Sequence, residues 1–153
     1  MTIMDGNSPT AGVIHSLHIK EQHGAPMQRV KSAEAVTMKG IKGDQAYGRK
    51  SRQVLLVDQS QIDQLGVRPG DLRENLTVEG LTLDGMPVGT RLKSDDVVLR
   101  IVEVCDPCSY LDTIRQGLKR ESVGRRGMLA VIENGGRLEE GRPIEVLAFG
   151  ADF

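Results

Sequence analysis

Short extended segments recur at intervals of roughly ten residues along this chain, with turn-forming residues between them. The extended segments are 12–19, 29–38, 53–58, 73–78, 90–93, 97–104, 127–133 and 141–147. Within them, Val54 to Val57 is a continuous apolar run, which is typical of a strand buried on both faces. The chain's 18 glycines provide the many turns that such a pattern needs. We therefore predict a mainly β fold, a barrel or a sandwich, rather than a doubly wound sheet with regularly alternating helices.

Two segments have helical patterns. Residues 58–65 form a short one, with Ser60 as its expected cap. Residues 106–120 form the clearer helical pattern, because Leu111, Ile114 and Leu118 fall on one face and basic residues lie at its C-terminal end. A length of 153 residues suits one domain. We expect it to span residues 11–148, preceded by a flexible arm at 1–10 and followed by a tail at 149–153.

Composition excludes several classes of function. The net charge is −1, aromatic residues make up 3% of the chain, and tryptophan is absent, so neither an electrostatic nor a base-stacking nucleic-acid surface is expected. No apolar run approaches the ~18–20 residues of a membrane span. The first residues lack the basic and apolar regions of a signal peptide, so we expect a cytoplasmic protein that does not bind membranes.

The two cysteines lie three residues apart, in the segment Cys105-Asp106-Pro107-Cys108. Asp106 suits a helix N-cap and Pro107 suits the first helical position, which would place Cys108 in the positive first turn of the predicted helix. A thiolate is stabilised there, and the local sequence favours a reactive Cys108 about as much as a packed one. Cys105 ends an apolar run and is expected to be a core or accessory residue.

Other cysteine chemistries have less support. A dithiol redox pair is open, but that motif usually accompanies a βαβ context. A zinc site would need His15 and His18 as further ligands, and these residues point to opposite faces of a strand. No nucleophile elbow, phosphate-binding P-loop or dinucleotide fingerprint is present.

Basic residues cluster beside glycines in three loops. These are Lys42-Gly43-Asp44, Arg49-Lys50-Ser51-Arg52 and Gly124-Arg125-Arg126-Gly127. Arginine beside exposed backbone N–H groups is suited to binding phosphate, although each loop taken alone is more simply a solvated, charged loop.

Several blocks in order resemble the MOSC domain family, which is named after the C-terminal domain of molybdenum cofactor sulfurase. The resemblance extends from about Gly12 to Leu147. Its blocks are Gly40 to Asp44, Arg52 to Leu56, Pro69-Gly70, Glu74 to Leu81, Val88-Gly89, Pro107-Cys108, Gly127 and Gly135 to Gly141. The Glu-Asn-Leu block at 74–76 is the most specific match.

This resemblance implies a β-rich fold related to the small barrel of pyruvate kinase. It implies that Cys108 is the reactive residue, which either carries sulfur as a persulfide or binds the molybdenum of a molybdopterin cofactor. Residues expected to hold the cofactor or shape its loops are Lys42, Gly43, Asp44, Arg52, Arg73, Glu74, Asn75, Arg126 and Gly127. The family is also associated with pyridoxal phosphate binding.

Three functions remain open at this point. The first is a sulfur carrier or molybdenum-cofactor protein with a sulfur donor or acceptor protein as its partner. It would act in sulfur transfer or in the assembly of a metal-sulfur cluster or cofactor, as a sulfurtransferase or a molybdenum-dependent oxidoreductase. The second is a non-catalytic barrel that binds a partner or an anion and merely packs Cys108. The third is a dithiol redox protein that uses Cys105 and Cys108.

Overall fold

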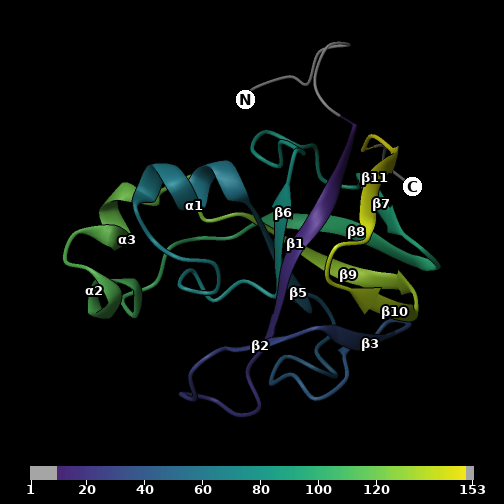
Figure 1. Ribbon diagram of the computed structural model, residues 1–153, viewed down its shortest axis with the longest axis horizontal. Helices are drawn as coiled ribbons and strands as arrows, with labels where there is room; N and C mark the ends of the chain where they lie inside the picture. The colour runs from purple at the N-terminus through teal and green to yellow at the C-terminus, as the bar shows by residue number, and fades with distance from the viewer. Residues whose placement is uncertain (1–9, 151–153) are drawn as a thin grey trace.

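Seven strands close into a barrel in the computed structural model, which describes residues 10–150 (Figure 1). Around the barrel they are β1 (Ala11–Ile19), β6 (Leu76–Glu79), β5 (Val54–Asp58), β9 (Met128–Asn134), β8 (Val97–Val104), β7 (Arg91–Ser94) and β11 (Pro143–Ala148). β11 pairs with β1 and closes the ring. Neighbouring strands are antiparallel except β5 and β6, which are parallel. The predicted mainly β barrel with a few short helices is confirmed.

Four further strands lie beside the barrel. β2 (Gln28–Val30) pairs with the end of β1, while β3 (Ser32–Val36) pairs with β4 (Gly40–Ile41) and β10 (Gly136–Glu139) in a small second sheet. The prediction of one strand over 29–38 was therefore wrong, because the chain passes from one sheet to the other at Lys31. The strands β4 and β10 were not predicted, because each begins with a glycine, a residue that favours turns.

Two apolar clusters stabilise the fold. The larger one fills the barrel, and the smaller one lies between the outside of the barrel and the helices. β5 serves both: Val54 and Leu56 point into the barrel, whereas Leu55 and Val57 pack in the outer cluster. All residues of β5 are buried, so the prediction of a strand covered on both faces is confirmed.

Three short helices gather on one side of the barrel, away from β7 and β11 (Figure 1). α1 (Gln59–Leu65) matches the predicted helix over 58–65, but its cap is Asp58 and not Ser60. The Asp58 side chain accepts a hydrogen bond from the backbone N–H of Gln61, which satisfies one of the free donors of the first turn.

The prediction of one long helix over 106–120 was wrong. The segment holds α2 (Leu111–Ile114) and α3 (Leu118–Glu121), separated by an extended Arg115 and by Gly117 in the left-handed region (φ 87°). Residues 105–108 belong to no helix or turn. Asp106 caps nothing with its side chain, and its backbone carbonyl instead accepts a hydrogen bond from Arg126. Cys108 therefore does not lie in the first turn of a helix, and the dipole argument for its reactivity does not apply.

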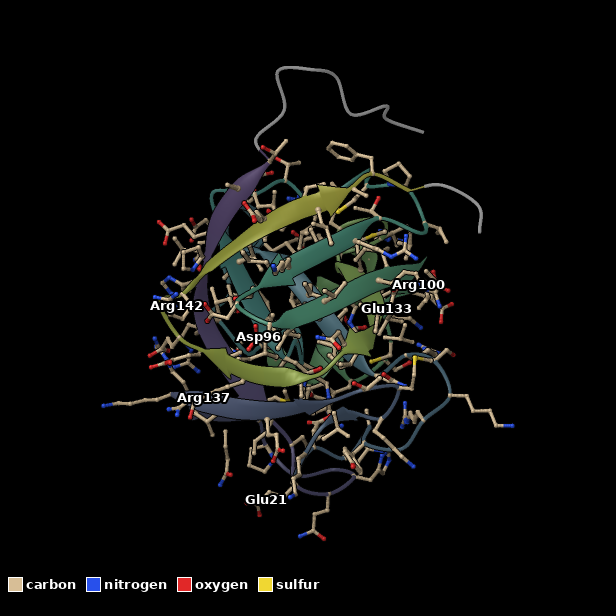
Figure 2. The ribbon with its side chains drawn as sticks, turned by 90° about the vertical axis from the view of Figure 1, so that its right-hand side faces the viewer. Glu21, Asp96, Arg100, Glu133, Arg137 and Arg142 are labelled. Atoms are coloured by element: carbon tan, nitrogen blue, oxygen red, sulfur yellow. The ribbon has the colours of Figure 1, made fainter. Side chains whose placement is uncertain are left out.

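Several ion pairs lie on the side of the barrel opposite the helices (Figure 2). Glu133 joins Arg91 and Arg100 across three strands, and Arg142 pairs with Asp95 at 2.8 Å. No helix within residues 10–150 has the length and apolar character needed to cross a membrane. Most of the arm expected at 1–10 and of the tail expected at 149–153 lies outside the described residues, at 1–9 and 151–153.

Candidate functional site

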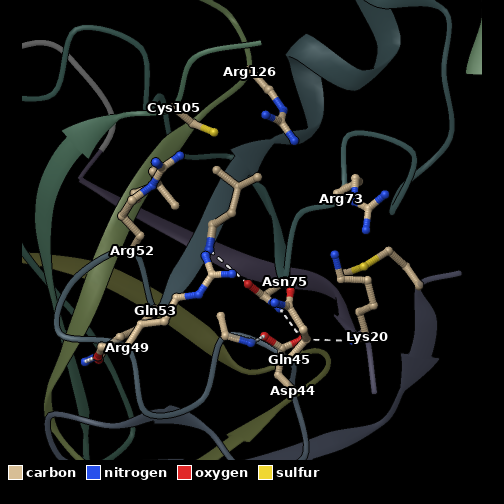
Figure 3. Close-up of a pocket in the computed structure, with 14 residues that line it drawn as sticks. Lys20, Asp44, Gln45, Arg49, Arg52, Gln53, Arg73, Asn75, Cys105 and Arg126 are labelled. Carbon is tan, nitrogen blue, oxygen red and sulfur yellow. Dashed lines mark hydrogen bonds between the residues drawn. The ribbon is translucent and has the colours of Figure 1, made fainter. Parts of the chain in front are cut away.

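A cavity of about 140 Å³ opens where β5 and β6 begin (Figure 3). Because these two strands are parallel and adjacent, the residues that precede them come together although they are some twenty positions apart in the sequence. The cavity is lined by Lys20, Met27, Asp44, Gln45, Ala46, Arg49, Arg52, Gln53, Leu55, Arg73, Asn75, Cys105, Arg126 and Leu129.

Positive charge dominates this cavity. Lys20 and four arginines line it, and Asp44 is its only carboxylate. The Asp44 carboxylate is already occupied, since it accepts hydrogen bonds from the backbone N–H of Lys20 at 2.8 Å and of Ala46 at 3.1 Å. The Arg52 guanidinium lies 3.5 Å from the carboxylate of the half-exposed Glu103, a residue that does not line the cavity. The remaining excess of cations is suited to an anion.

Two of the arginines sit in strained backbone. Arg52 has φ 52° and Arg73 has φ 65°, in the left-handed region that favours glycine. This conformation costs about 1–2 kcal/mol for a residue with a side chain. Each arginine lies just before one of the two parallel strands. Strain retained at a cavity, where glycine would fit the backbone better, is an observation that points to function.

Arg126 is the most buried of the cavity cations, at 7% exposure. Its guanidinium donates to the backbone carbonyl of Asp106 at 2.8 Å and to that of Leu72 at 3.4 Å. Its Nε has no hydrogen-bond partner among residues 10–150. A buried charge normally pairs or bonds fully, so this incomplete set of partners is consistent with a site for an anionic ligand.

Cys105 and Lys20 give the cavity two nucleophilic groups. Figure 3 shows Cys105 at the end near Arg52 and Arg126, with Lys20 near Asp44 and Arg73. Burial raises the pKa of the Cys105 thiol, and the positive Arg126 and Arg52 partly oppose that rise. Burial lowers the pKa of Lys20, and the positive charge of Arg73 lowers it further.

The Glu-Asn pair at 74–75 acts mainly as a support. The Asn75 amide accepts from the backbone N–H of Leu55 at 3.0 Å and donates to the carbonyl of His18 at 3.1 Å, so it ties β5 to β1. The Glu74 carboxyl is fully buried and accepts from the Gly70 N–H at 2.8 Å and the Thr77 hydroxyl at 2.7 Å. Burial raises the pKa of Glu74 to about 6.

The structure brings together half of the predicted site residues. Those that line the cavity are Asp44, Arg52, Arg73, Asn75 and Arg126, whereas Lys42, Gly43, Glu74, Gly127 and Cys108 do not line it.

Three of the residues outside the cavity, Lys42, Gly127 and Cys108, make contacts elsewhere in the fold. Lys42 is exposed and lies 3.6 Å from Glu34. A Cβ on Gly127 would come within 2.2 Å of the Leu56 carbonyl oxygen, so this glycine permits close packing of two strands. Cys108 is half-buried against the outer apolar cluster, which also contains Cys105.

Sequence reasoning missed Lys20 and the structural role of Gln53. Lys20 carries no motif, and only the fold places it opposite the arginines. Gln53 links three segments, donating to the carbonyls of Met38 and Arg49 and accepting from the N–H of Ile132. Cys105 was expected to be core or accessory, and it is both buried and part of the cavity wall.

The cavity fits one end of the cofactor that the family resemblance implies. Its surplus of cations and the unpartnered Arg126 Nε fit the phosphate end of a molybdopterin cofactor, and its volume suits that end alone. Within residues 10–150, no three His, Cys, Asp or Glu side chains cluster as a ligand set for a metal ion. A soft metal would take its ligand from a cysteine.

Comparison with known proteins agrees with this fold. YuaD from Bacillus subtilis superposes with a TM-score of 0.83 at 19% identity, over 93% of this chain and 98% of that one. YiiM from Geobacillus stearothermophilus gives 0.70 at 16% identity, over 89% and 75%, and YiiM from Escherichia coli gives 0.68 at 18%, over 94% and 71%. A search of curated proteins finds no match. The MOSC domain profile matches residues 21–145, and this chain therefore belongs to the MOSC domain family.

Proposed function

We propose that this protein binds the anionic end of a molybdenum-pterin cofactor in the cationic cavity and uses Cys108 as a soft sulfur. The observation that carries the proposal is Arg126, a buried cation with an unpartnered N–H, in a cavity with four further cations. Membership of a family named after molybdenum cofactor sulfurase supports the choice of this anion over others.

The arginines would hold the phosphate. Arg126 is fixed by two backbone carbonyls, so its orientation is set before the ligand arrives, while Arg52 and Arg73 approach from the starts of the two parallel strands. A guanidinium pairs with two phosphate oxygens at once, which gives orientation as well as affinity. Bound molybdenum would supply redox chemistry; the chain itself contributes the cations, a thiol and a neighbouring apolar surface.

Cys108 would act in one of two ways. As a thiolate it is a soft ligand of the kind that molybdenum accepts. As a sulfur carrier it would attack the outer sulfur of a donor persulfide, so that a new S–S bond forms on Cys108 and the donor leaves as a thiolate. In both cases its half-buried position leaves part of the side chain accessible.

Elemental and mass analysis tests this function directly. Wild-type, Cys108→Ser and Cys105→Ser proteins would be made in cells that synthesise molybdenum cofactor. We expect molybdenum, or the added mass of one sulfur atom, on the wild type and on Cys105→Ser, and neither on Cys108→Ser. Absence of both from the wild type would refute the proposal, and retention by Cys108→Ser would refute the assignment to Cys108.

The anion site is tested separately with pyrophosphate as the probe. Arg49→Gln is expected to weaken pyrophosphate binding about fivefold, since one cation near an anion in a partly exposed cavity contributes roughly 1 kcal/mol. Lys42→Gln is the matched control, because Lys42 is an exposed cation outside the cavity. Equal effects of both substitutions would indicate general charge attraction and no site.

A second candidate is the non-catalytic barrel. It is favoured by one observation: the Cys108 side chain packs against the same apolar cluster as Cys105. Reaction rates with a small thiol reagent separate the two functions. A Cys108 that reacts no faster than an ordinary thiol would support the packed interpretation.

The dithiol alternative is tested by oxidation. Both cysteines are free in the structure, so a disulfide between them that forms on oxidation and opens on reduction would support this alternative, and failure to form one would exclude it.

A further inference from the structure

Tyr110 contacts one of the cavity arginines from outside the cationic cavity. The guanidinium of Arg73 lies over the Tyr110 ring, 4.0 Å from its centroid. Arg73 lines the cavity, whereas Tyr110 does not. The two residues are far apart in the sequence, since Arg73 precedes β6 and Tyr110 is the residue before α2. The fold therefore brings an aromatic side chain from the helical side of the barrel against a cation of the anion site.

The ring contact leaves the donors of Arg73 available. Its guanidinium makes no hydrogen bond or ion pair within residues 10–150. Arg126, in contrast, donates to two backbone carbonyls, and Arg52 lies beside Glu103. A guanidinium that stacks on a ring keeps its in-plane N–H groups free for other partners. The ring thus restricts where the Arg73 side chain lies without using the donors that an anion needs.

Arg73 needs such a restraint if it is to hold an anion. Its backbone has φ 65°, and a long side chain with several rotatable bonds leaves the chain there. An unrestrained guanidinium would sample many positions, and binding would have to order it at a cost in entropy. A cation within about 6 Å of a ring centroid is attracted to the face of the ring. The contact with Tyr110 therefore reduces that cost before the anion binds.

The same contact reaches the segment that carries Cys108. This segment connects β8 to α2, and cavity arginines contact it on both sides of the cysteine. Arg126 donates to the carbonyl of Asp106 at 2.8 Å, and Arg73 lies over Tyr110. An anion that fixes Arg73 also restrains the ring beneath it and hence the half-buried Cys108. By linkage, a restrained segment favours the anion by the same factor.

We propose that Tyr110 is a positioning residue of the anion site. Its ring holds the Arg73 guanidinium ready for a phosphate group, and through this contact the occupied site restrains the segment around Cys108. This role rests on the proposed function, because the anion is the one that the cationic cavity is proposed to bind. The phenol hydroxyl has no part in it, since the face of the ring makes the contact.

Calorimetry with pyrophosphate tests the role of the ring. Tyr110→Phe keeps the ring and should bind within about twofold of the wild type, whereas Tyr110→Leu keeps only an apolar side chain and should bind about fivefold more weakly. Tyr47→Leu is the matched control, because Tyr47 is the other tyrosine, is similarly exposed (40% against 37%) and does not line the cavity. An equal loss in Tyr47→Leu, or no loss in Tyr110→Leu, would overturn the proposal.

A double-mutant cycle separates positioning from general support of the fold. In an Arg73→Gln background, Tyr110→Leu should change pyrophosphate affinity by no more than about twofold, since the ring acts through the guanidinium. A fivefold loss in that background as well would refute the role. Wild-type protein that binds no pyrophosphate would refute the anion site itself and this role with it. Wild-type and Tyr110→Leu proteins that bind equally would refute the role of Tyr110 alone.

The restraint on Cys108 is measured by its rate of reaction with N-ethylmaleimide, in Cys105→Ser protein so that one thiol reports. Saturating pyrophosphate should slow this reaction at least about threefold, and Tyr110→Leu should remove most of that slowing. The same slowing in Tyr110→Leu would come from the charge of the anion alone. That result, or no slowing in protein with Tyr110 intact, would overturn the link to Cys108.

Discussion

Glu74 should make this fold less stable as the pH rises through the slightly acidic range. Its carboxyl is fully buried, and burial raises its pKa from 4.5 to about 6. The folded state therefore holds the proton more tightly than the unfolded state does. The stability that this proton contributes is fully present below 4.5 and is lost as the pH passes about 6. The difference between the two pKa values corresponds to about 2 kcal/mol.

Glu74→Gln isolates this contribution. Glutamine does not titrate, and its carbonyl oxygen can still accept from the Gly70 N–H and the Thr77 hydroxyl. Urea unfolding of both proteins would be measured from about pH 4 to about pH 7.5. We expect the stability of the wild type relative to the variant to fall by about 2 kcal/mol over this range. Glu79→Gln, at an exposed carboxylate in β6, should show no such trend. A difference that stays constant, or that rises with pH, would refute the reasoning.

Three further outcomes are expected. Asn75→Ala should lower the unfolding free energy by about 3 kcal/mol, because buried backbone groups of two strands lose their partner; a loss below about 1 kcal/mol in urea unfolding would contradict this. Gly127→Ala should destabilise by about 3 kcal/mol or more through its clash with Leu56, whereas Gly124→Ala, with open space around it, should cost about 1 kcal/mol; thermal unfolding compares them. Arg73→Gly should change the unfolding free energy by no more than about 1 kcal/mol, because relief of backbone strain at position 73 offsets the lost contact between the guanidinium and the Tyr110 ring. The same substitution should weaken pyrophosphate binding, and calorimetry that finds unchanged affinity would exclude Arg73 from the anion site.

The fold was predictable where local pattern and burial coincide. The continuous apolar run of β5 predicted a strand covered on both faces, and the extended segment predicted at 97–104 matches β8 over its full length. The prediction of one helix over 106–120 failed although its apolar spacing was correct, because the extended Arg115 and the left-handed Gly117 divide the segment into two short helices. The spacing of Leu111 and Leu118 reflects packing against one cluster, which two short helices satisfy as well as one long helix.

The candidate site was predictable only in part, for a topological reason. The basic loops were visible in the sequence, but nothing local distinguishes Arg126, which lines the cavity, from Arg125, which bonds Gln61 and Gln64 on α1. Lys20 ends up opposite the arginines because β1 runs antiparallel to β6, a pairing that the spacing of residues does not reveal. Long-range strand pairing therefore decides which charged loops meet.

The parallel pair β5–β6 explains why the cavity lies where it does. In an otherwise antiparallel barrel, it is the one place where two adjacent strands of the described chain begin at the same edge. Arg52 and Arg73 precede these strands in the same left-handed conformation, and a β-region residue at either position would direct its side chain elsewhere. The strain is thus the cost of aiming two cations at one point. A barrel closed by antiparallel strands alone would have no equivalent place for them, which ties the anion site to the topology and not to the number of basic residues.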